Sequence, residues 1–578
     1  MLGVNCHLST TAFTAFTMTA PIPVPRDPHA THEVTNQPVP LEDYNLFAGD
    51  RALKDALAFN LPPARLEAAR ARLWALGAEL GTREMFAAGA AANRNLPVLH
   101  THDRIGRRRD EVEYHPTYHE LMALLMRHGL HSGAWADGTQ GAHVERAAAY
   151  LLFAEVENGT QCPATMTYGS VPAIRRDAAL AAEWLPKILS REYDPRNIPA
   201  HGKRSVLIGM GMTEKQGGSD VRANTTQAVR ADSHEWRITG HKWFLSAPMC
   251  DAWLVLAQSP GGLSCFFMPR FTPEGAPNAI RIQRLKDKLG NRSNASSEVE
   301  FHDATATLLG EEGRGVPMIL EMGVYTRLDC AIGSAGLMRQ ALAQALWHAA
   351  QRSAFGRLLR DQPAMQNVLA DLALEAEAAT ALAMRLSRAY DAQVDERERL
   401  LARVLTPAAK FWICKRGAHF AEEAMEAIGG SGYVEENALS RIYREMPVNS
   451  IWEGSGNIMC LDVLRALRKA PEVSDAVMAE LDAARGVHPA FDRFCAALRA
   501  RLADAAEFES AARRLTQDLA LAIQASLLAR HAPAFVSEAF CASRLAGDTG
   551  GAFGMLAPTA PFAALIERAM PLESTGSE

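Results

Sequence analysis

The sequence predicts a multidomain α+β protein in which a helical region, an antiparallel β-domain and a second helical region follow one another. The chain has 578 residues. A single hydrophobic core does not organise a chain of this length, so we expect two to four domains. Apolar residues repeat at helical spacing before about residue 200 and after about residue 312, and with a period of two in between. The strand-like segments are closely spaced without helices between them, which is typical of an antiparallel sheet or small barrel.

Composition excludes several classes of protein. The apolar fraction is 48 % and the net charge is −6, and neither value points to a nucleic-acid partner. No apolar run reaches the roughly 20 residues that a membrane helix needs. The nine cysteines are scattered and never spaced as Cys-x-x-Cys, which argues against a disulfide framework and a zinc site and favours reduced thiols in a cytoplasmic protein. We therefore expect no metal and no membrane partner.

The first 36 residues are predicted to be a disordered N-terminal extension. They contain no lysine or arginine before Arg26 and several prolines between residues 21 and 28. This pattern does not match a secretory signal or an Arg-rich transit peptide. At the other end, we expect the chain to fray from about Leu572.

Residues 37–200 are predicted to form an N-terminal α-helical domain. Pro63–Gly81, Val144–Gly159 and Ala173–Leu189 carry apolar residues three and four positions apart. We expect a loop or turn at Cys162–Thr167, because it contains a proline. Residues 201–312 are predicted to form the β-domain. Its expected strands are Ser205–Gly209, Glu235–Ile238, Ala252–Gln258, Leu263–Pro269, Ala279–Leu285 and Ser297–Phe301.

Helices return after Gly315. Met318–His348, Gln362–Asp391, Leu400–Ile428 and Asn457–Lys469 are long and apolar-periodic, which predicts an antiparallel helical bundle over residues 313–470. Residues 471–578 are also helical in pattern but contain arginine and no lysine. We expect them to form an extra helical domain.

The stretch from Asn449 to Arg465 holds the strongest catalytic candidate. Glu453 follows two large apolar residues and precedes a Gly-Ser-Gly-Asn turn and an apolar-periodic run. Ser455 or Asn457 can cap that run, and the glycines allow a ligand to approach the backbone closely. Burial raises a carboxylate pKa and a helix N-terminus lowers it, and in either case Glu453 is a candidate proton acceptor. The alternative is an ordinary capping or surface glutamate.

Two further segments carry candidate binding residues. Met212–Asp220 is rich in glycine and hydroxyl groups and follows a predicted strand, so its backbone N–H groups can face a phosphate or a ring carbonyl. Gly240–Ser246 ends a strand with two aromatic residues and a hydroxyl. Taken alone, the first segment is better explained as a glycine-rich connection between strands, and the second as a packed strand end.

Taken in order, these segments resemble the acyl-CoA dehydrogenase family. Met212–Asp220 resembles its T-E-x-x-x-G-S-D segment, and Gly240–Ser246 its G-x-K-x-W-I-T segment. The other similar segments are K-L-G-x-R at 288–292, R-x-x-F-G at 352–356, G-G-x-G-Y at 429–433 and Y-E-G at 452–454. The resemblance runs from about Pro40 to Lys469.

The resemblance implies an acyl-CoA dehydrogenase-like fold that binds FAD, usually in a homotetramer. The neighbouring subunit would supply Arg352 and Phe355 to the FAD. The implied flavin contacts within the chain are Met210, Thr213, Ser219, Phe244, Leu245, Ser246, Ile451, Trp452, Gly454, Ser455, Gly456, Asn457 and Leu461.

The resemblance also implies a reaction. Glu453 would take the α-proton of a CoA thioester while the β-hydride passes to the flavin N5. The alternative base position of some family members is Thr326 here, which leaves Glu453 as the matched base. The family's usual glutamines are replaced by Glu426 and Pro363, and Ala247 stands where the family has asparagine, so contacts between subunits are expected to differ.

Within the family, the chain is most similar to the DNA-alkylation-response flavoproteins of the AidB type. The similarity lies in residues 209–220, 286–296 and 445–464 and in the added C-terminal region. It implies FAD, weak dehydrogenase activity, binding of double-stranded DNA through the C-terminal extension, and a role in inactivating alkylating agents. Arg465 resembles an arginine of the substrate or DNA pocket in that branch.

The charge of the extension conflicts with DNA binding. Residues 471–578 hold nine arginines against fourteen acidic residues, a net charge of −5, whereas a DNA-binding domain is expected to carry a basic stripe. Seven arginines remain candidates for one basic face: Arg493, Arg499, Arg501, Arg513, Arg514, Arg530 and Arg544. Residues elsewhere, such as Arg107–Arg109, are further candidates.

Three functions therefore stay open. The first is an FAD flavoprotein of the DNA-alkylation response that binds duplex DNA. The second is an ordinary acyl-CoA dehydrogenase that desaturates a CoA thioester with Glu453 as base. The third is a flavin-bound scaffold or DNA-binding protein whose chemistry is idle.

Overall fold

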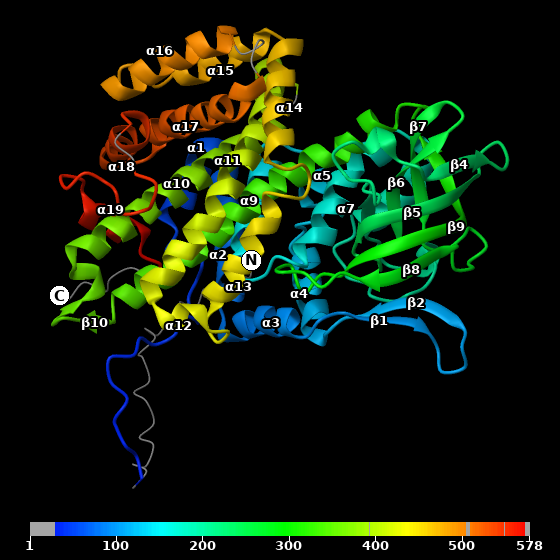
Figure 1. The fold of residues 1–578 in the computed structure, drawn as a ribbon, viewed down its shortest axis with the longest axis horizontal. Coiled ribbons are helices and arrows are strands. Elements are labelled where there is room, and N and C mark those ends of the chain that lie inside the picture. Colours follow the sequence, from blue (N-terminus) through cyan, green and yellow to red (C-terminus); the bar gives the residue numbers. More distant parts are fainter. Residues whose placement is uncertain (1–28, 392–393, 505–508, 548–549, 573–578) are drawn as a thin grey trace, which may run out of the picture. The chain divides into compact units, whose positions relative to one another are not determined.

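The computed structural model describes residues 29–391, 394–504, 509–547 and 550–572 (Figure 1). The described residues from Pro38 onward form one compact unit, and the chain divides from it after Gln37. Most of the predicted N-terminal extension and the residues after Leu572 lie outside the described residues. Residues 29–37 contain no helix or strand.

The N-terminal region is helical, as predicted. Its helices are α1 (Arg51–Asn60), α2 (Pro63–Leu80), α3 (Arg83–Arg94), α4 (Pro116–Arg127), α5 (Gly133–Asp137), α6 (Ala142–Ala154), α7 (Gln161–Ile174) and α8 (Ala178–Ile188). The loop expected at Cys162–Thr167 is wrong, because these residues form the first turns of α7. Pro163 is tolerated there, since an N–H group in the first turn has no partner within the helix.

A β-hairpin interrupts this helical region and was not predicted. Its strands β1 (Val98–His102) and β2 (Arg108–Glu113) pair antiparallel, with Val98 opposite Glu113 and His102 opposite Arg108. The sequence lacks the apolar alternation that marks a half-buried strand, because most of its side chains are exposed or half-exposed.

The β-domain is a seven-stranded sheet that curls into a small barrel. The strand order is β3-β6-β4-β5-β9-β7, β8 pairs with β9, and a further pairing of β6 with β7 closes the ring. Five expected strands are confirmed, with β5 and β9 longer than expected, while β4 was missed and β3 begins three residues late and pairs parallel to β6. The strands are β3 (Ile208–Gly211), β4 (Gln227–Arg230), β5 (Trp236–Ser246), β6 (Ala252–Ser259), β7 (Gly262–Pro269), β8 (Ile280–Leu285) and β9 (Ser296–Leu309).

The bundle is built around α9 (Gly315–Ala349), which is buried on most of its circumference as expected of a central helix. Helices α10 (Pro363–Asp391) and α11 (Glu396–Ile428) are also confirmed as long helices. The remaining elements are the two-residue strands β10 (Ser353–Ala354) and β11 (Arg357–Leu358) and the helices α12 (Gly430–Tyr433), α13 (Ala438–Asn449) and α14 (Gly456–Lys469).

The C-terminal extension packs against the bundle (Figure 1). It contains α15 (Glu472–Asp482), α16 (Pro489–Asp504), α17 (Ala512–His531), α18 (Ala534–Phe540), a π-helical turn at Cys541–Leu545 and α19 (Phe562–Ala569). Leu519, Leu527 and Leu528 of α17 are fully buried in the common core. Among the described residues, no helix is both long and apolar enough to cross a membrane.

Candidate active site

Glu453 lies on a strained turn between α13 and α14. Its backbone is left-handed with φ of +58°, and Gly454 follows with φ of +110°. A non-glycine residue in this conformation costs of order 1–3 kcal/mol, so the surrounding structure must hold it. Arg327 Nε of α9 donates to the Glu453 carbonyl oxygen over 2.9 Å, and Lys410 Nζ of α11 donates to the Gly454 carbonyl oxygen. Two cations from two helices therefore fix the turn.

The Glu453 carboxylate points toward the middle of α9. Thr326 Oγ1 donates a hydrogen bond to Glu453 Oε2 over 2.5 Å. Burial raises the pKa of Glu453, and the Thr326 hydrogen bond and the charges of Arg327 and Lys410 only partly oppose it. A carboxylate with a raised pKa is a stronger base than an exposed one, which is what proton abstraction requires. Ser455 stands at the N-cap position of α14 but makes no capping hydrogen bond through its side chain.

The β-domain contributes the ends of two strands. Met210 lies in β3, and Thr213 follows it, with its carbonyl oxygen accepting a hydrogen bond of 2.8 Å from the Trp243 backbone N–H. Leu245 and Ser246 close β5, where Leu245 is buried and Phe244 is 46 % exposed. The two segments that resemble family motifs are thus adjacent.

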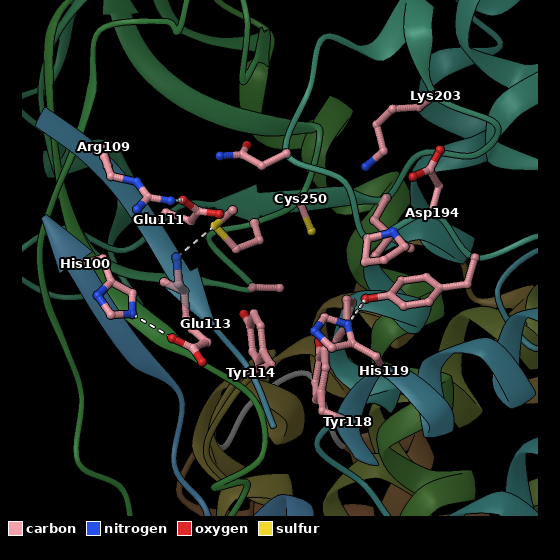
Figure 2. Close-up of a pocket in the computed structure, with 18 residues that line it drawn as sticks. His100, Arg109, Glu111, Glu113, Tyr114, Tyr118, His119, Asp194, Lys203 and Cys250 are labelled. Carbon is pink, nitrogen blue, oxygen red and sulfur yellow. Dashed lines mark hydrogen bonds and ion pairs between the residues drawn. The ribbon is translucent and has the colours of Figure 1, made fainter. Parts of the chain in front are cut away.

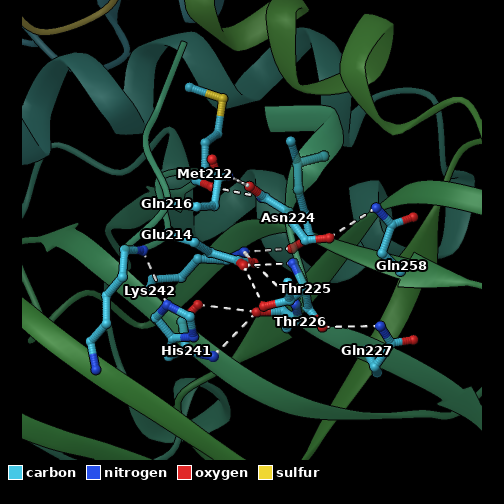
Figure 3. A network of polar contacts seen from close by, with 12 residues as sticks. Met212, Glu214, Gln216, Asn224, Thr225, Thr226, Gln227, His241, Lys242 and Gln258 are labelled. Atoms are coloured by element: carbon cyan, nitrogen blue, oxygen red, sulfur yellow. Dashed lines mark hydrogen bonds and ion pairs between the residues drawn. The ribbon is translucent and has the colours of Figure 1, made fainter. Parts of the chain in front are cut away.

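A buried ion pair fastens these two segments together. Lys242 Nζ donates to Glu214 Oε1 over 2.8 Å, and both side chains are fully buried. Figure 3 shows the same carboxylate facing Thr225 and Thr226, whose backbone N–H groups donate to it over 2.6 and 3.2 Å. Burial tends to raise the pKa of Glu214, but Lys242 and these hydrogen bonds hold it down at about 2. Glu214 is therefore an anchor for the loop that carries Thr213 and Ser219.

Cys162 connects the β-domain with the Glu453 turn. Burial and the Glu453 carboxylate together raise the pKa of its thiol to about 12, although the charge of Lys288 and hydrogen bonding to Ser246 and Asn294 oppose the shift. The thiol therefore lies beside Ser246 and within the electrostatic influence of Glu453.

The residues around this centre fit a flavin. The indole Nε1 of Trp452 is buried and has no hydrogen-bond partner among the described residues, so it can donate to an acceptor on a bound group. Phe244 presents an exposed ring to stack on. A Cβ at Gly218 would lie 2.5 Å from Thr213 Oγ1, so this loop requires a small residue. Met210, Thr213, Ser219 and 244–246 would hold the flavin on one side, and Ile451–Asn457 with Leu461 on the other.

Arg352 and Phe355 do not join this site within one chain. They lie beside or between β10 and β11, at the end of the bundle away from the β-domain (Figure 1). Phe355 has a left-handed backbone with φ of +52° and is 98 % exposed.

Arginines surround the start of α14. Asp462 forms ion pairs with Arg327 at 3.2 Å, Arg403 at 2.8 Å and Arg465 at 3.0 Å. From the extension, Arg513 Nη1 donates to Asn457 Oδ1 over 2.9 Å. We call Arg327, Arg403, Arg465 and Arg513 the arginine rim of the site. Three guanidinium groups share one carboxylate, so the rim carries excess positive charge.

Most arginines of the extension are used for packing. Five of the seven candidates for a basic face form ion pairs. Arg501 and Arg514 both pair with Asp518, and Arg530 pairs with Glu480 at 2.9 Å. In the described part of the extension, acidic partners therefore offset the charge of most of these arginines.

A separate cavity of about 400 Å³ lies between the β1–β2 hairpin and the β-domain. Figure 2 shows His100, Arg109, Glu111 and Glu113 on the hairpin side and Tyr118 and His119 opposite. None of the predicted site residues lines it. Its floor includes Pro163 and Ala247, which directly follow Cys162 and Ser246 in the sequence.

Sequence reasoning missed the roles of four residues at the site. Glu214 and Lys242 stand in the two recognised motifs, but nothing local shows that they pair across 28 residues. Thr326 was considered only as an alternative base position, whereas its hydroxyl bonds to the base. Cys162 was assigned to a loop, and its place beside Ser246 depends on the fold of α7. No group of three or more potential metal ligands occurs among the described residues.

Comparison with known proteins gives the family. Three family models match: the adaptive response protein AidB N-terminal domain at residues 36–195, and the acyl-CoA dehydrogenase middle and C-terminal domains at 209–304 and 313–468. AidB of Escherichia coli (strain K12), whose name groups it with acyl-CoA dehydrogenases, is 49 % identical over 523 residues, covering 90 % of this chain and 95 % of that protein. Acyl-CoA dehydrogenase family member 11 of Caenorhabditis elegans is 30 % identical, covering 73 % of this chain and 70 % of that one.

Solved structures agree. The structure of Caenorhabditis elegans ACDH-11 in complex with C11-CoA has a TM-score of 0.80 and 25 % identity, covering 97 % of this chain and 96 % of that chain. The Bd2924 apo-form has a TM-score of 0.78 and 29 % identity, covering 87 % and 100 %. With these matches the fold class is confirmed, and FAD is confirmed as the cofactor. The chain belongs to the AidB-type branch of the acyl-CoA dehydrogenase family and is an FAD-dependent oxidoreductase that acts on CH–CH groups.

Proposed function

We propose that this protein is a flavoprotein of the DNA-alkylation response that binds double-stranded DNA, inactivates alkylating agents and retains weak acyl-CoA dehydrogenase activity. The similarity to AidB over 90 % of the chain supports the assignment to this branch. The observation that carries DNA binding is the arginine rim beside the Glu453 turn.

The rim has the charge and exposure that a polyanion requires. Arg327, Arg403 and Arg465 bring three positive charges to the single negative charge of Asp462. The side chains of Arg403 and Arg465 are 41 % and 58 % exposed, so both can reach a phosphate while they remain near Asp462. Phosphate contacts of this kind supply most of the sequence-independent affinity for DNA.

Duplex binding at increasing salt tests this proposal. Removing one arginine that neutralises a phosphate reduces the slope of log affinity against log salt by about 0.9, so the double variant Arg403→Ala/Arg465→Ala is expected to lower it by about 2. The matched control is Arg70→Ala, an exposed arginine of α2 paired with Glu67, which is expected to leave the slope unchanged. Failure of the unmodified protein to bind duplex DNA even at low salt would overturn the proposal.

The dehydrogenase activity is assigned to Glu453. Its carboxylate accepts the α-proton of a CoA thioester, Thr326 orients the carboxylate, and Arg327 and Lys410 hold the turn. FAD, when bound, accepts the β-hydride, so proton and electron pair leave adjacent carbons and a double bond forms between them. The hydrogen bond from Thr326 and the raised pKa of Glu453 support this assignment.

A homotetramer completes the proposal. The tip of the β10–β11 hairpin exposes almost all of the Phe355 side chain, and burying such a ring against a second copy is favourable by about 1.5–3 kcal/mol. Arg352 and Phe355 would then contact the FAD of the neighbouring subunit. Phe355→Ala is expected to lower both the oligomeric state, measured by analytical ultracentrifugation, and FAD retention. Unchanged sedimentation and FAD content would contradict it.

The second candidate is an ordinary acyl-CoA dehydrogenase, which the geometry of Glu453 and Thr326 also favours. Turnover separates the two, since typical enzymes reach about 1–10³ per second. Rapid turnover of a CoA thioester together with no duplex binding would favour this candidate. The first proposal places the protein in the cytoplasm, in keeping with the free thiols of all eight described cysteines.

A further inference from the structure

The β1–β2 hairpin holds four arginines and four acidic residues over 98–113, and its tip presents Arg104 and Arg107 away from the flavin site. We propose that this hairpin is an arm that enters a groove of duplex DNA, with Arg104 and Arg107 on the phosphates and Ile105 against the bases. This inference rests on the DNA binding proposed above and adds a contact surface distinct from the arginine rim. In Figure 1 the arm runs along the side of the β-domain, far from α14.

The tip of the arm is a fixed turn. Asp103 Oδ1 accepts hydrogen bonds of 2.9 Å from the backbone N–H groups of both Ile105 and Arg107. The Asp103 N–H donates to the Arg107 carbonyl oxygen over 2.8 Å, and Gly106 takes up the left-handed position with φ of +84° and nothing near it. The turn is therefore pre-organised, which reduces the entropy lost on binding.

Charge on the arm is concentrated at this tip. Residues 102–109 contain four arginines and one acidic residue, Asp103, whose carboxylate is engaged by the turn itself. Residues 104–109 are all exposed. Arg108 and Arg109 pair with Asp110 and Glu111 at the base. Within the part of the chain that the structure describes, Arg104 and Arg107 have no ion pair, so their charge is available to phosphates.

The base of the arm is anchored to the β-domain. Asp110 is buried, accepts a hydrogen bond of 3.0 Å from the Ile282 N–H of β8, and its carbonyl oxygen accepts one from Arg270. Arg108 Nη2 donates to the Ile282 carbonyl oxygen over 3.0 Å. The pairing register shifts between His100 and His102 opposite a left-handed Asp110 with φ of +49°, and such a bulge bends a strand and redirects its end.

An apolar side chain at the tip distinguishes DNA from a generic acidic surface. Ile105 is 63 % exposed between the two free arginines. A two-stranded ribbon fits the major groove, and apolar side chains flanked by basic ones contact thymine methyl groups or wedge between base steps. An isoleucine between two unpaired arginines therefore matches a groove that has bases at its floor and phosphates along its edges.

Duplex binding by the full-length protein with bound FAD tests the arm. The double variant Arg104→Ala/Arg107→Ala is expected to reduce the slope of log affinity against log salt by about 2. The double replacement of both arginines by lysine is expected to restore it. Ile105→Ala is expected to weaken binding by several-fold and leave the slope unchanged, because an apolar contact releases no counterions. The control is Arg485→Ala/Arg499→Ala, two exposed arginines of the extension that pair with Asp482.

The outcomes separate the two proposals. If the unmodified protein does not bind duplex DNA at low salt, both the proposed function and the proposed role of the arm are overturned. If the unmodified protein binds and the alanine variant at positions 104 and 107 keeps the full slope, only the arm is overturned. A slope reduced instead by the Arg485/Arg499 variant would assign the contact to the extension. The arm proposal would also be overturned if the alanine variant at positions 104 and 107 lost binding to phosphatidylglycerol vesicles but bound duplex DNA as the unmodified protein does.

Discussion

Two glutamates of neighbouring family motifs have opposite environments. Glu214 is fully buried and its carboxylate accepts hydrogen bonds from Lys242, Thr225 and Thr226, which together hold its pKa at about 2. Glu453 lies on a left-handed turn, accepts one hydrogen bond from a neutral hydroxyl, and has a raised pKa.

The difference shows how one residue type serves two roles. A carboxylate surrounded by donors and a cation stays ionised and cannot take up a proton at neutral pH, so Glu214 is suited to hold a loop in place. A half-buried carboxylate with few partners is partly desolvated and gains more from protonation, so Glu453 is suited to act as a base. The same conservative replacement at the two positions should therefore have different consequences.

The largest expected effect is that of Glu453→Gln on turnover. Amide replacement removes the proton acceptor but keeps its size, and general-base catalysis contributes typically 10²–10⁴-fold. We expect turnover of short acyl-CoA thioesters with an artificial electron acceptor to fall by that factor while FAD content and the unfolding midpoint stay unchanged. Turnover within a few-fold of the unmodified protein would remove Glu453 as the base.

Glu214→Gln is expected to affect stability instead. It leaves Lys242 buried without its counter-charge, and breaking a buried pair in this way costs about 3–5 kcal/mol. We expect a lower midpoint in denaturant unfolding and loss of FAD, with unchanged turnover per bound FAD. A normal midpoint with impaired turnover per FAD would reverse the roles assigned to the two glutamates.

The stability difference should depend on pH in a defined direction. The pKa of Glu214 is about 2 in the folded protein and near 4.3 in an unfolded chain. Its contribution is therefore fully present above about pH 4.3 and is lost as the pH falls toward 2. Denaturant midpoints of the unmodified protein and Glu214→Gln should converge over this range, and a constant gap would contradict the assigned pKa.

Thr326→Val should sharpen the account of Glu453. The hydrogen bond from Thr326 lowers the Glu453 pKa, so its removal raises that pKa and moves the acid limb of the kcat/KM profile to higher pH. Below that limb we expect activity to fall by roughly three- to tenfold, in line with a hydrogen bond worth about 1 kcal/mol. A profile that keeps its limb and falls uniformly would indicate misplacement of the base instead.

Arg513→Ala should give the smallest effect. It removes the hydrogen bond from the extension to Asn457, worth about 0.5–1.5 kcal/mol. We expect FAD dissociation to accelerate a few-fold. Arg493→Ala, which changes an arginine of the same extension, is the matched control. Equal rates for both variants would show that the extension does not support the turn.

Clear patterns of apolar residues were sufficient to predict much of the fold from the sequence. The continuous apolar run at 252–257 and the helical spacing at 362–391 predicted β6 and α10 to within one residue. Polar segments gave the errors, since the β1–β2 hairpin has no apolar alternation and β4 is a short, largely exposed strand. At Cys162–Thr167, a proline in the first turn of a helix resembled a loop.

The candidate site divides in the same way. The motif segments around Thr213, Ser246 and Glu453 were recognisable because their residues are contiguous. Their partners come from distant parts of the chain, such as Thr326 of α9, which is 127 residues from Glu453. Composition likewise could not predict that the arginines of the extension form ion pairs. Their acidic partners, such as Glu480 and Asp518, come close only in the folded chain.

The central claim is that Glu453 takes the α-proton while Glu214 only holds the site together. Anaerobic mixing of a panel of short straight- and branched-chain acyl-CoA thioesters with the unmodified protein, Glu453→Gln and Glu214→Gln tests it directly, with loss of visible flavin absorbance recorded per bound FAD. We predict that at least one thioester bleaches the flavin of the unmodified protein and of Glu214→Gln at similar rates, and that Glu453→Gln bleaches at least about 10²-fold more slowly. Equal bleaching of Glu453→Gln and the unmodified protein would contradict the account.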